Sequence, residues 1–207
     1  MNTFTRRLQV PGAAGALEVL RDDPDGPTQG VAFLAHPHPL FGGTMDNKVV
    51  QTMARAFVQG GWSSVRFNFR GVGGSAGVHD EGRGEADDMR LLVAHFAPEG
   101  PIALGGFSFG AFVASQVLAS VWDTREVRKI VLVGTAASRF SVSAIPLEAH
   151  DRTLVVHGEE DDTVPLQSVL DWARPQALPV SVVPGGGHFF HGQLPLLKSL
   201  VARHLRS

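Results

Sequence analysis

Two pentapeptides in this chain have the pattern Gly-x-Ser-x-Gly, which can present a nucleophilic serine on a turn between a strand and a helix. One spans residues 106–110 and contains Ser108, and the other spans residues 73–77 and contains Ser75. Ser108 follows an apolar, strand-like run and precedes a helix-like run, whereas Ser75 precedes a polar, loop-like segment. We therefore predict that Ser108 is the nucleophile and that Ser75 is a loop residue.

Backbone amides near this serine could stabilise the negative charge that develops during acyl transfer. Phe109 follows Ser108 and opens the predicted helix, so its free N–H can donate to an oxyanion. A second donor is expected in the loop at residues 36–43, which follows the first long apolar strand. Two prolines in this loop have no N–H and cannot donate. We predict the amide of His38 as the second donor, with Leu40 as the alternative.

A serine hydroxyl reacts only when a base takes its proton and a third group orients that base. In doubly wound sheets with this turn, the acid and then the histidine follow the serine along the chain. The acidic candidates are residues 159–162, although Asp162 or Thr163 could instead cap the following helix. His188 lies in a loop rich in glycine and aromatic residues, which favours it as the base over His191.

Two other histidines and one glycine-rich segment are given no catalytic role. His157 ends a strand-like run and is expected to pack inside the protein, and His204 is expected to face solvent on the last helix. His36 and His38 have the spacing of two metal ligands, but no acid or third histidine is near them in sequence. Residues 70–74 lack the Lys–Ser/Thr pair of a phosphate-binding loop, and their arginine is expected to form an ion pair. We therefore predict neither a metal nor an organic cofactor.

Short apolar runs alternate with amphipathic stretches along the chain, which is typical of parallel strands connected by helices. Residues 8–10 and 16–20 alternate around a Pro-Gly turn and predict an antiparallel hairpin. Buried strands are expected at residues 31–35, 65–69, 102–104, 130–133, 154–156 and 180–183. Helices are expected at residues 46–59, 89–96, 109–121, 165–174 and 194–205. The pattern predicts an α/β fold with a doubly wound, mostly parallel sheet of about eight strands, in a single domain over residues 1–207.

Composition excludes several classes of protein. The 18 basic and 20 acidic residues form no block of like charge, which argues against a nucleic-acid partner or an anionic membrane surface. The absence of cysteine excludes disulfides and a cysteine nucleophile. No apolar run approaches the roughly 18–20 residues of a membrane span, and residues 1–12 contain no apolar core of a signal peptide. We expect a soluble, cytoplasmic protein, either a monomer or a homodimer.

Together these features resemble the α/β-hydrolase superfamily over nearly the whole chain. The resemblance depends on the pentapeptide at Ser108 and on residues 36–48, 67–75, 157–165 and 187–190. Residues 36–48 and 67–75 are similar to those of small bacterial hydrolases related to dienelactone hydrolases and to serine aminopeptidase-like esterases. The resemblance implies the α/β-hydrolase fold and a catalytic triad of Ser108, Asp161 and His188.

The resemblance also implies an activity. We expect a carboxylesterase-like serine hydrolase (EC 3.1.1) that cleaves a small to medium acyl substrate through an acyl-enzyme, without a cofactor. Superfamily members usually carry a lid, but only residues 135–151 are available for one here, so little or no lid is expected. The open cleft is predicted to be bordered by Leu40, Phe41, Phe107, Phe109, Phe189 and Phe190. The alternatives are a peptidase or thioesterase with the same triad, or a non-catalytic binding protein. Dienelactone hydrolases proper use a cysteine nucleophile, which this chain lacks.

Overall fold

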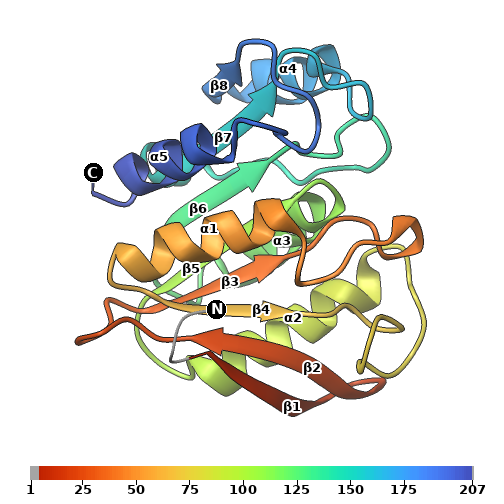
Figure 1. Ribbon diagram of the computed structural model, residues 1–207, viewed down its shortest axis with the longest axis vertical. Coiled ribbons are helices and arrows are strands. Elements are labelled where there is room, and N and C mark those ends of the chain that lie inside the picture. The colour runs from red at the N-terminus through yellow and green to blue at the C-terminus, as the bar shows by residue number, and fades with distance from the viewer. Residues whose placement is uncertain (1–4, 207) are drawn as a thin grey trace.

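The computed structural model describes residues 5–206, and across them the chain forms an eight-stranded sheet in the order β1-β2-β4-β3-β5-β6-β7-β8 (Figure 1). The strands are β1 (Arg6–Gly12), β2 (Gly15–Asp22), β3 (Val31–Ala35), β4 (Ser63–Phe67), β5 (Ile102–Phe107), β6 (Val127–Val133), β7 (Thr153–Gly158) and β8 (Val180–Val183). β1 pairs antiparallel with β2, and β2 pairs antiparallel with β4. The other neighbouring pairs are parallel, so the predicted fold class is confirmed.

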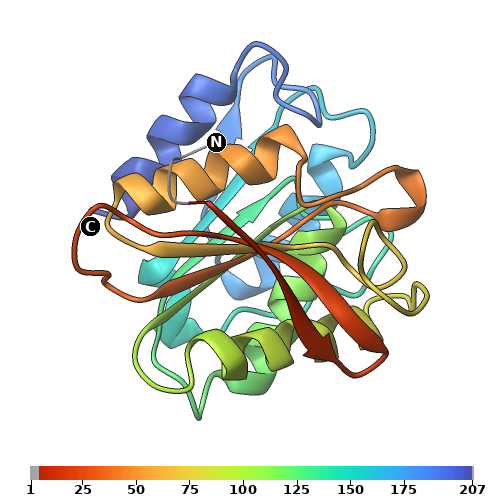
Figure 2. The ribbon, with the colours of Figure 1, turned by 60° about the horizontal axis from the view of Figure 1, so that its bottom comes forward.

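Helices cover both faces of the sheet (Figure 2). The helices are α1 (Lys48–Gln59), α2 (Arg83–Phe96), α3 (Phe109–Val121), α4 (Leu166–Ala173) and α5 (Leu194–His204), with short 3-10 helices η1 (Pro39–Phe41), η2 (Leu147–Arg152) and η3 (Arg174–Gln176). Apolar residues of α1 and α5 pack in one core on one face. Those of α2, α3 and α4 pack in a second core on the other face. The central strands are therefore apolar without alternation, because both of their sides are buried.

Several predicted elements differ from the structure at their ends, and one predicted residue differs in its exposure. The helix predicted from residue 165 begins at Leu166, with Pro165 as its N-cap. The strand predicted to reach residue 69 ends at Phe67. His204 was expected to face solvent, but it is half-buried and its Nε2–H donates to the carbonyl of Arg152 at 3.1 Å. Burial is the main cause that lowers the pKa of His204 to about 4.

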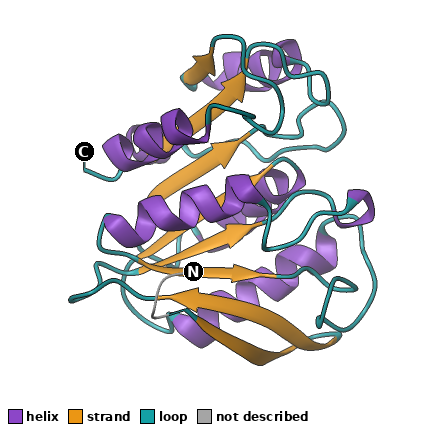
Figure 3. Ribbon diagram, viewed as in Figure 1, coloured by secondary structure: helices purple, strands orange, loops and turns teal. Residues whose placement is uncertain are grey.

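The parallel strands all end at one edge of the sheet, and most of the long loops gather there (Figure 3). In open α/β sheets this edge is where ligands bind. The connection between β6 and β7 carries the short η2 and no inserted domain, which agrees with the expected minimal lid. No helix within residues 5–206 is long and apolar enough to cross a membrane.

Candidate active site

Ser108 occupies a strained turn between β5 and α3. Its φ and ψ are 57° and −116°, a conformation that costs a non-glycine residue free energy and that clusters at functional sites. The flanking glycines allow close backbone contact: a Cβ on Gly106 would lie 2.1 Å from the carbonyl oxygen of Gly110. A Cβ on Gly110 would lie 2.3 Å from the carbonyl oxygen of Ala35. The pattern Gly-x-Ser-x-Gly is therefore a steric requirement of this crossing.

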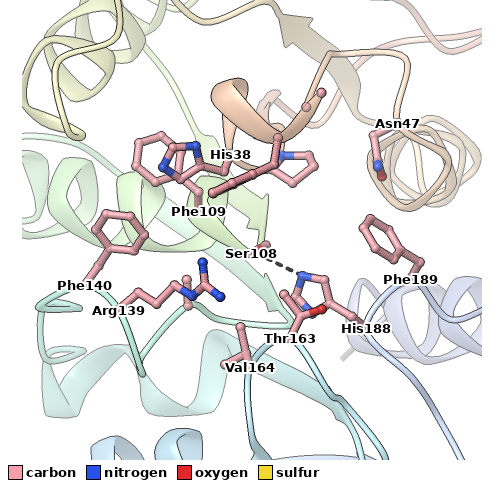
Figure 4. Close-up of a pocket in the computed structure, with 15 residues that line it drawn as sticks. His38, Asn47, Ser108, Phe109, Arg139, Phe140, Thr163, Val164, His188 and Phe189 are labelled. Carbon is pink, nitrogen blue, oxygen red and sulfur yellow. Dashed lines mark hydrogen bonds between the residues drawn. The ribbon is translucent and has the colours of Figure 1, made fainter.

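A chain of hydrogen bonds connects Ser108 to His188 and then to Asp161. The Ser108 hydroxyl donates to Nε2 of His188 at 3.0 Å (Figure 4). Nδ1–H of His188 donates to Oδ2 of Asp161 at 2.7 Å. The three side chains are buried and come from the loops after β5, β8 and β7. His191, the alternative base, is exposed, and its ring packs against that of Phe189.

The carboxylate of Asp161 is held by its own loop. Its Oδ1 accepts from the amides of Thr163 and Val164 at 3.0 and 2.7 Å. Burial alone would raise the pKa of Asp161, but the hydrogen bonds from His188 and from the amide of Val164 lower it below its usual value. His157 Nε2–H donates to the carbonyl of Val164 at 2.8 Å, which fixes the far side of this loop. Asp161 therefore stays ionised and oriented.

The suggested capping role of Asp162 or Thr163 is wrong. The N-cap of α4 is Pro165, and no side chain caps that helix. The hydroxyl of Thr163 instead donates to Oδ1 of Asp162 at 3.3 Å. The carboxylate of Asp161 accepts from the amides of Thr163 and Val164, which precede the helix, so it holds the loop and does not cap α4.

Two backbone amides near Ser108 are available to a ligand. The amide of Phe109 lies in the first turn of α3, where N–H groups have no acceptor within the helix. In the described loop 37–43, the amides of residues 40–43 are bonded within the loop: Leu40 to Nδ1 of His38, Phe41 and Gly43 to the carbonyl of His38, and Gly42 to the carbonyl of Pro39. The prolines have no N–H, so the amide of His38 is the one that remains in this loop. The structure thus disfavours Leu40, the alternative donor.

The imidazole of His36 holds this loop against the end of β4. Its Nδ1–H donates to the carbonyl of Pro37 at 2.6 Å, and its Nε2 accepts from the amide of Phe69 at 2.9 Å. The side chain is fully buried, and burial lowers the pKa of His36 to about 4. His36 therefore holds the loop in its neutral form.

Because His36 is buried in its neutral form, we expect the free energy of unfolding to fall in acid. The folded-state pKa of His36, about 4, lies below the ordinary histidine value of 6.5. The unfolded chain therefore takes up the proton first, and the stabilisation present above pH 6.5 is lost as the pH falls towards 4. Chemical unfolding at pH 7 and pH 4.5 should show that His36 contributes about 2 kcal/mol to this loss. His36→Gln removes the titration and should reduce the acid dependence by that amount; equal dependences in the two proteins would contradict the prediction.

Comparison with known proteins places this geometry in a family. The chain is similar to a serine hydrolase without a lid from Xanthomonas campestris, at 34% identity over all of this chain and 95% of that one, with a TM-score of 0.87. It is also similar to an α/β serine hydrolase homologue from Coxiella burnetii, at 36% identity over 97% of both chains, with a TM-score of 0.82. The chain belongs to the α/β serine hydrolases.

Other comparisons add less to this assignment. An uncharacterized protein of Rickettsia prowazekii is 39% identical to this hydrolase over 116 residues. That match covers 54% of this chain and about half, 49%, of the relative. No family model matches the chain.

A pocket of about 240 Å³ opens beside Ser108 and His188 in this hydrolase (Figure 4). Its apolar wall is formed by Phe41, Phe109, Ala136, Phe140, Val164 and Phe189. His38, Asn47, Arg139 and Thr163 add polar groups. The pocket is therefore an aromatic cleft with Ser108 at one side. Among its lining residues, Arg139 has the one permanently charged side chain.

Three of the predicted cleft residues do not line this pocket. Leu40 is 70% exposed on η1, outside the pocket. Phe107 is fully buried in the core on the α1 and α5 face, where its ring lies 4.8 Å from that of His188. Phe190 is buried in the same core. The ring of Phe107 therefore packs against the imidazole of His188 from the core and does not face the pocket.

Sequence reasoning missed Arg139 and Phe140 in the pocket wall. Both follow β6, on a loop that carries no recognisable motif. The ring of Phe140 stacks on Phe112 at 4.8 Å and lies 5.1 Å from that of Phe109. Their position along the chain could have indicated this role. The loop after β6 lies at the same edge of the parallel sheet as the loops after β5 and β7.

The second pentapeptide is structural in this hydrolase. The Ser75 hydroxyl accepts from the amide of Glu18 at 2.9 Å and donates to the carbonyl of Asn68 at 2.7 Å. Arg70 forms the expected ion pair, with two hydrogen bonds to Asp88 at 2.8 and 2.9 Å. Within residues 5–206, no group of three or more His, Asp or Glu side chains is placed to hold a metal ion.

Proposed function

We propose that this α/β serine hydrolase cleaves small to medium carboxylic esters through a catalytic triad of Ser108, His188 and Asp161. The observation that carries the proposal is the position of the His188 imidazole, with Nε2 3.0 Å from the serine hydroxyl and Nδ1 2.7 Å from the carboxylate. This arrangement gives the neutral imidazole the tautomer that can accept the serine proton.

In the proposed reaction, Oγ of Ser108 attacks the acyl carbon while Nε2 of His188 takes the hydroxyl proton. The amides of Phe109 and His38 donate to the oxyanion of the tetrahedral intermediate, each contributing roughly 3 kcal/mol. The carbon–oxygen bond to the alcohol breaks, and His188 protonates the leaving alkoxide. Water then attacks the acyl-enzyme, and His188 takes its proton and returns one to Ser108 as the acid leaves.

The shape of the site supports a broad selectivity for small or medium esters. The pocket is open, mostly aromatic and covered by no inserted domain. An apolar wall distinguishes substrates of similar shape by only about 1–3 kcal/mol per methylene group. We therefore expect activity on several short-chain esters.

Covalent labelling with a fluorophosphonate tests the proposed nucleophile. A fluorophosphonate reacts with a serine that a neighbouring base activates, so we expect one adduct per chain, located on Ser108 by peptide mass spectrometry. Unfolded protein is the control and should not react. An adduct on Ser75, or none in folded protein, would overturn the proposed nucleophile.

A substrate panel separates ester hydrolysis from the alternatives. Short alkyl esters, acyl thioesters and aminoacyl amides should be compared by kcat/KM in the same buffer. We expect esters to react faster than amides, because an alkoxide leaves more readily than an amide nitrogen. A kcat/KM for the thioesters well above that for the esters would favour a thioesterase. Faster turnover of amides would favour a peptidase, and no turnover together with no labelling would favour a non-catalytic binding protein.

A further inference from the structure

Arg139 projects into the pocket from an anchored turn after β6. The amides of Arg139 and Phe140 both donate to the carbonyl of Ala136, at 3.2 and 3.1 Å. The ring of Phe140 is stacked on that of Phe112, which ties the turn to α3. The side chain of Arg139 is exposed, but its point of attachment is therefore fixed beside the site.

The guanidinium of Arg139 is directed towards the side of the pocket where Ser108 and His188 lie (Figure 4). It stacks over the ring of Phe41, with 6.0 Å between Cζ and the ring centroid. Among residues 5–206, no carboxylate forms a salt bridge with it, whereas other arginines are paired within the protein, Arg70 with Asp88 and Arg174 with Asp171. The charge of Arg139 therefore remains available to a molecule in the pocket.

The rest of the pocket wall offers this charge no counter-ion. No Asp or Glu is among the residues that line it, and Asp161 lies behind His188, where His188 and two amides already use its oxygens. The imidazole of His38 cannot act as a counter-ion, because it is neutral or positively charged. Burial is the main cause that lowers the pKa of His38, which favours the neutral imidazole. The charges of His79 and Arg139 lower this pKa further, and the charge of Glu85 raises it.

We propose that Arg139 selects esters that carry a carboxylate. The guanidinium would form charge-assisted hydrogen bonds with the carboxylate, while the aromatic wall holds the carbon chain between it and the ester carbonyl at Ser108. This inference depends on the proposed function, because it names the substrate class of the same site. The ester bond broken and the triad that breaks it are unchanged.

Matched pairs of esters test the proposal. Monoethyl adipate and ethyl adipamate differ only in a carboxylate or a neutral amide on the acyl side. The pair 4-acetoxybutyrate and 4-acetoxybutanamide makes the same comparison on the alcohol side. We expect kcat/KM of wild-type protein to favour the carboxylate about 5- to 10-fold in at least one pair. The preference should decrease in 0.5 M NaCl, which screens an exposed charge.

Variants assign that preference to a residue. Arg139→Gln should bring the ratio within each pair close to one, and Arg139→Lys should keep part of the preference. Arg203→Gln is the matched control, an exposed arginine in the last turn of α5 that does not line the pocket, and it should keep the wild-type ratio. No preference in either pair, or a preference that survives Arg139→Gln, would overturn the proposal.

The same assay distinguishes a failure of the role proposed for Arg139 from a failure of the proposed function. If the wild-type protein hydrolyses the neutral esters and Ser108→Ala does not, the proposed function holds whatever the ratio is. A ratio of one would then refute only the role of Arg139. If Ser108→Ala leaves hydrolysis unchanged, the proposed function and the inference both fail.

Discussion

Replacing Ser108 by alanine is expected to reduce ester turnover by about 10⁵- to 10⁶-fold, because the hydroxyl proposed to attack the acyl carbon is removed. The side chain contributes its one hydrogen bond to Nε2 of His188. Its removal should leave the fold intact, since the strained backbone at this position is imposed by the crossing of β5 and α3 and is kept by alanine. Steady-state kinetics on a short-chain ester and thermal unfolding of the same preparation measure both effects.

Ser75→Ala is the matched control, since it removes the serine of the other Gly-x-Ser-x-Gly pentapeptide. Its hydroxyl bonds the amide of Glu18 and the carbonyl of Asn68, so its loss leaves two buried polar groups unsatisfied. We expect near-normal turnover and a free energy of unfolding lower by about 1–3 kcal/mol. The opposite result, with activity lost in Ser75→Ala and kept in Ser108→Ala, would show that Ser75 is the nucleophile.

The fold and the meeting of Ser108 with His188 could be predicted because local sequence signals place each residue directly after a strand of a mostly parallel sheet. A strand, a glycine-flanked serine and a helix in direct succession can form only a sharp turn. His188 follows the last strand in a glycine-rich loop, so a parallel sheet carries it to the same edge. The order of these elements along the chain was sufficient for that prediction.

The cleft was less predictable because it depends on which way individual side chains point. Phe107 directly precedes Ser108, yet its ring lies in the core between the sheet and helices α1 and α5 and not in the pocket. There it packs against the imidazole of His188. Arg139 and Phe140 lie 31 and 32 residues after Ser108 on a loop without a motif, and their contacts are made only in the folded state. Sequence spacing does not encode such long-range packing.

The exposure of His204 could not be predicted from the sequence for the same reason. A histidine near the end of an amphipathic helix is usually placed on the solvent face from sequence alone. Here its imidazole reaches the carbonyl of Arg152, 52 residues away, just before β7 begins. Only the docking of α5 on the sheet shows that this side chain is half-buried.

Asp161→Asn is expected to lower turnover by up to about 10⁴-fold while the fold is kept. The amides of Thr163 and Val164 both donate to Oδ1, so the carbonyl oxygen of the asparagine must take that place. Its NH₂ group then faces Nδ1 of His188, where Oδ2 now accepts at 2.7 Å. An imidazole that accepts at Nδ1 carries its proton on Nε2 and cannot take the proton of Ser108. Kinetics on a short-chain ester and NMR of the imidazole protons measure the two parts of this effect.

The neighbouring acid gives the control for this experiment. Asp162 is exposed and, among residues 5–206, its carboxylate accepts only from the hydroxyl of Thr163. We therefore expect Asp162→Asn to change neither the tautomer nor the position of His188. We expect its turnover to stay within about twofold of wild type, as for most surface substitutions away from a site. A larger loss from Asp162→Asn than from Asp161→Asn would move the acid of the triad by one residue. Equal, small losses would mean that His188 keeps its tautomer without a carboxylate, and the role proposed for Asp161 would be wrong.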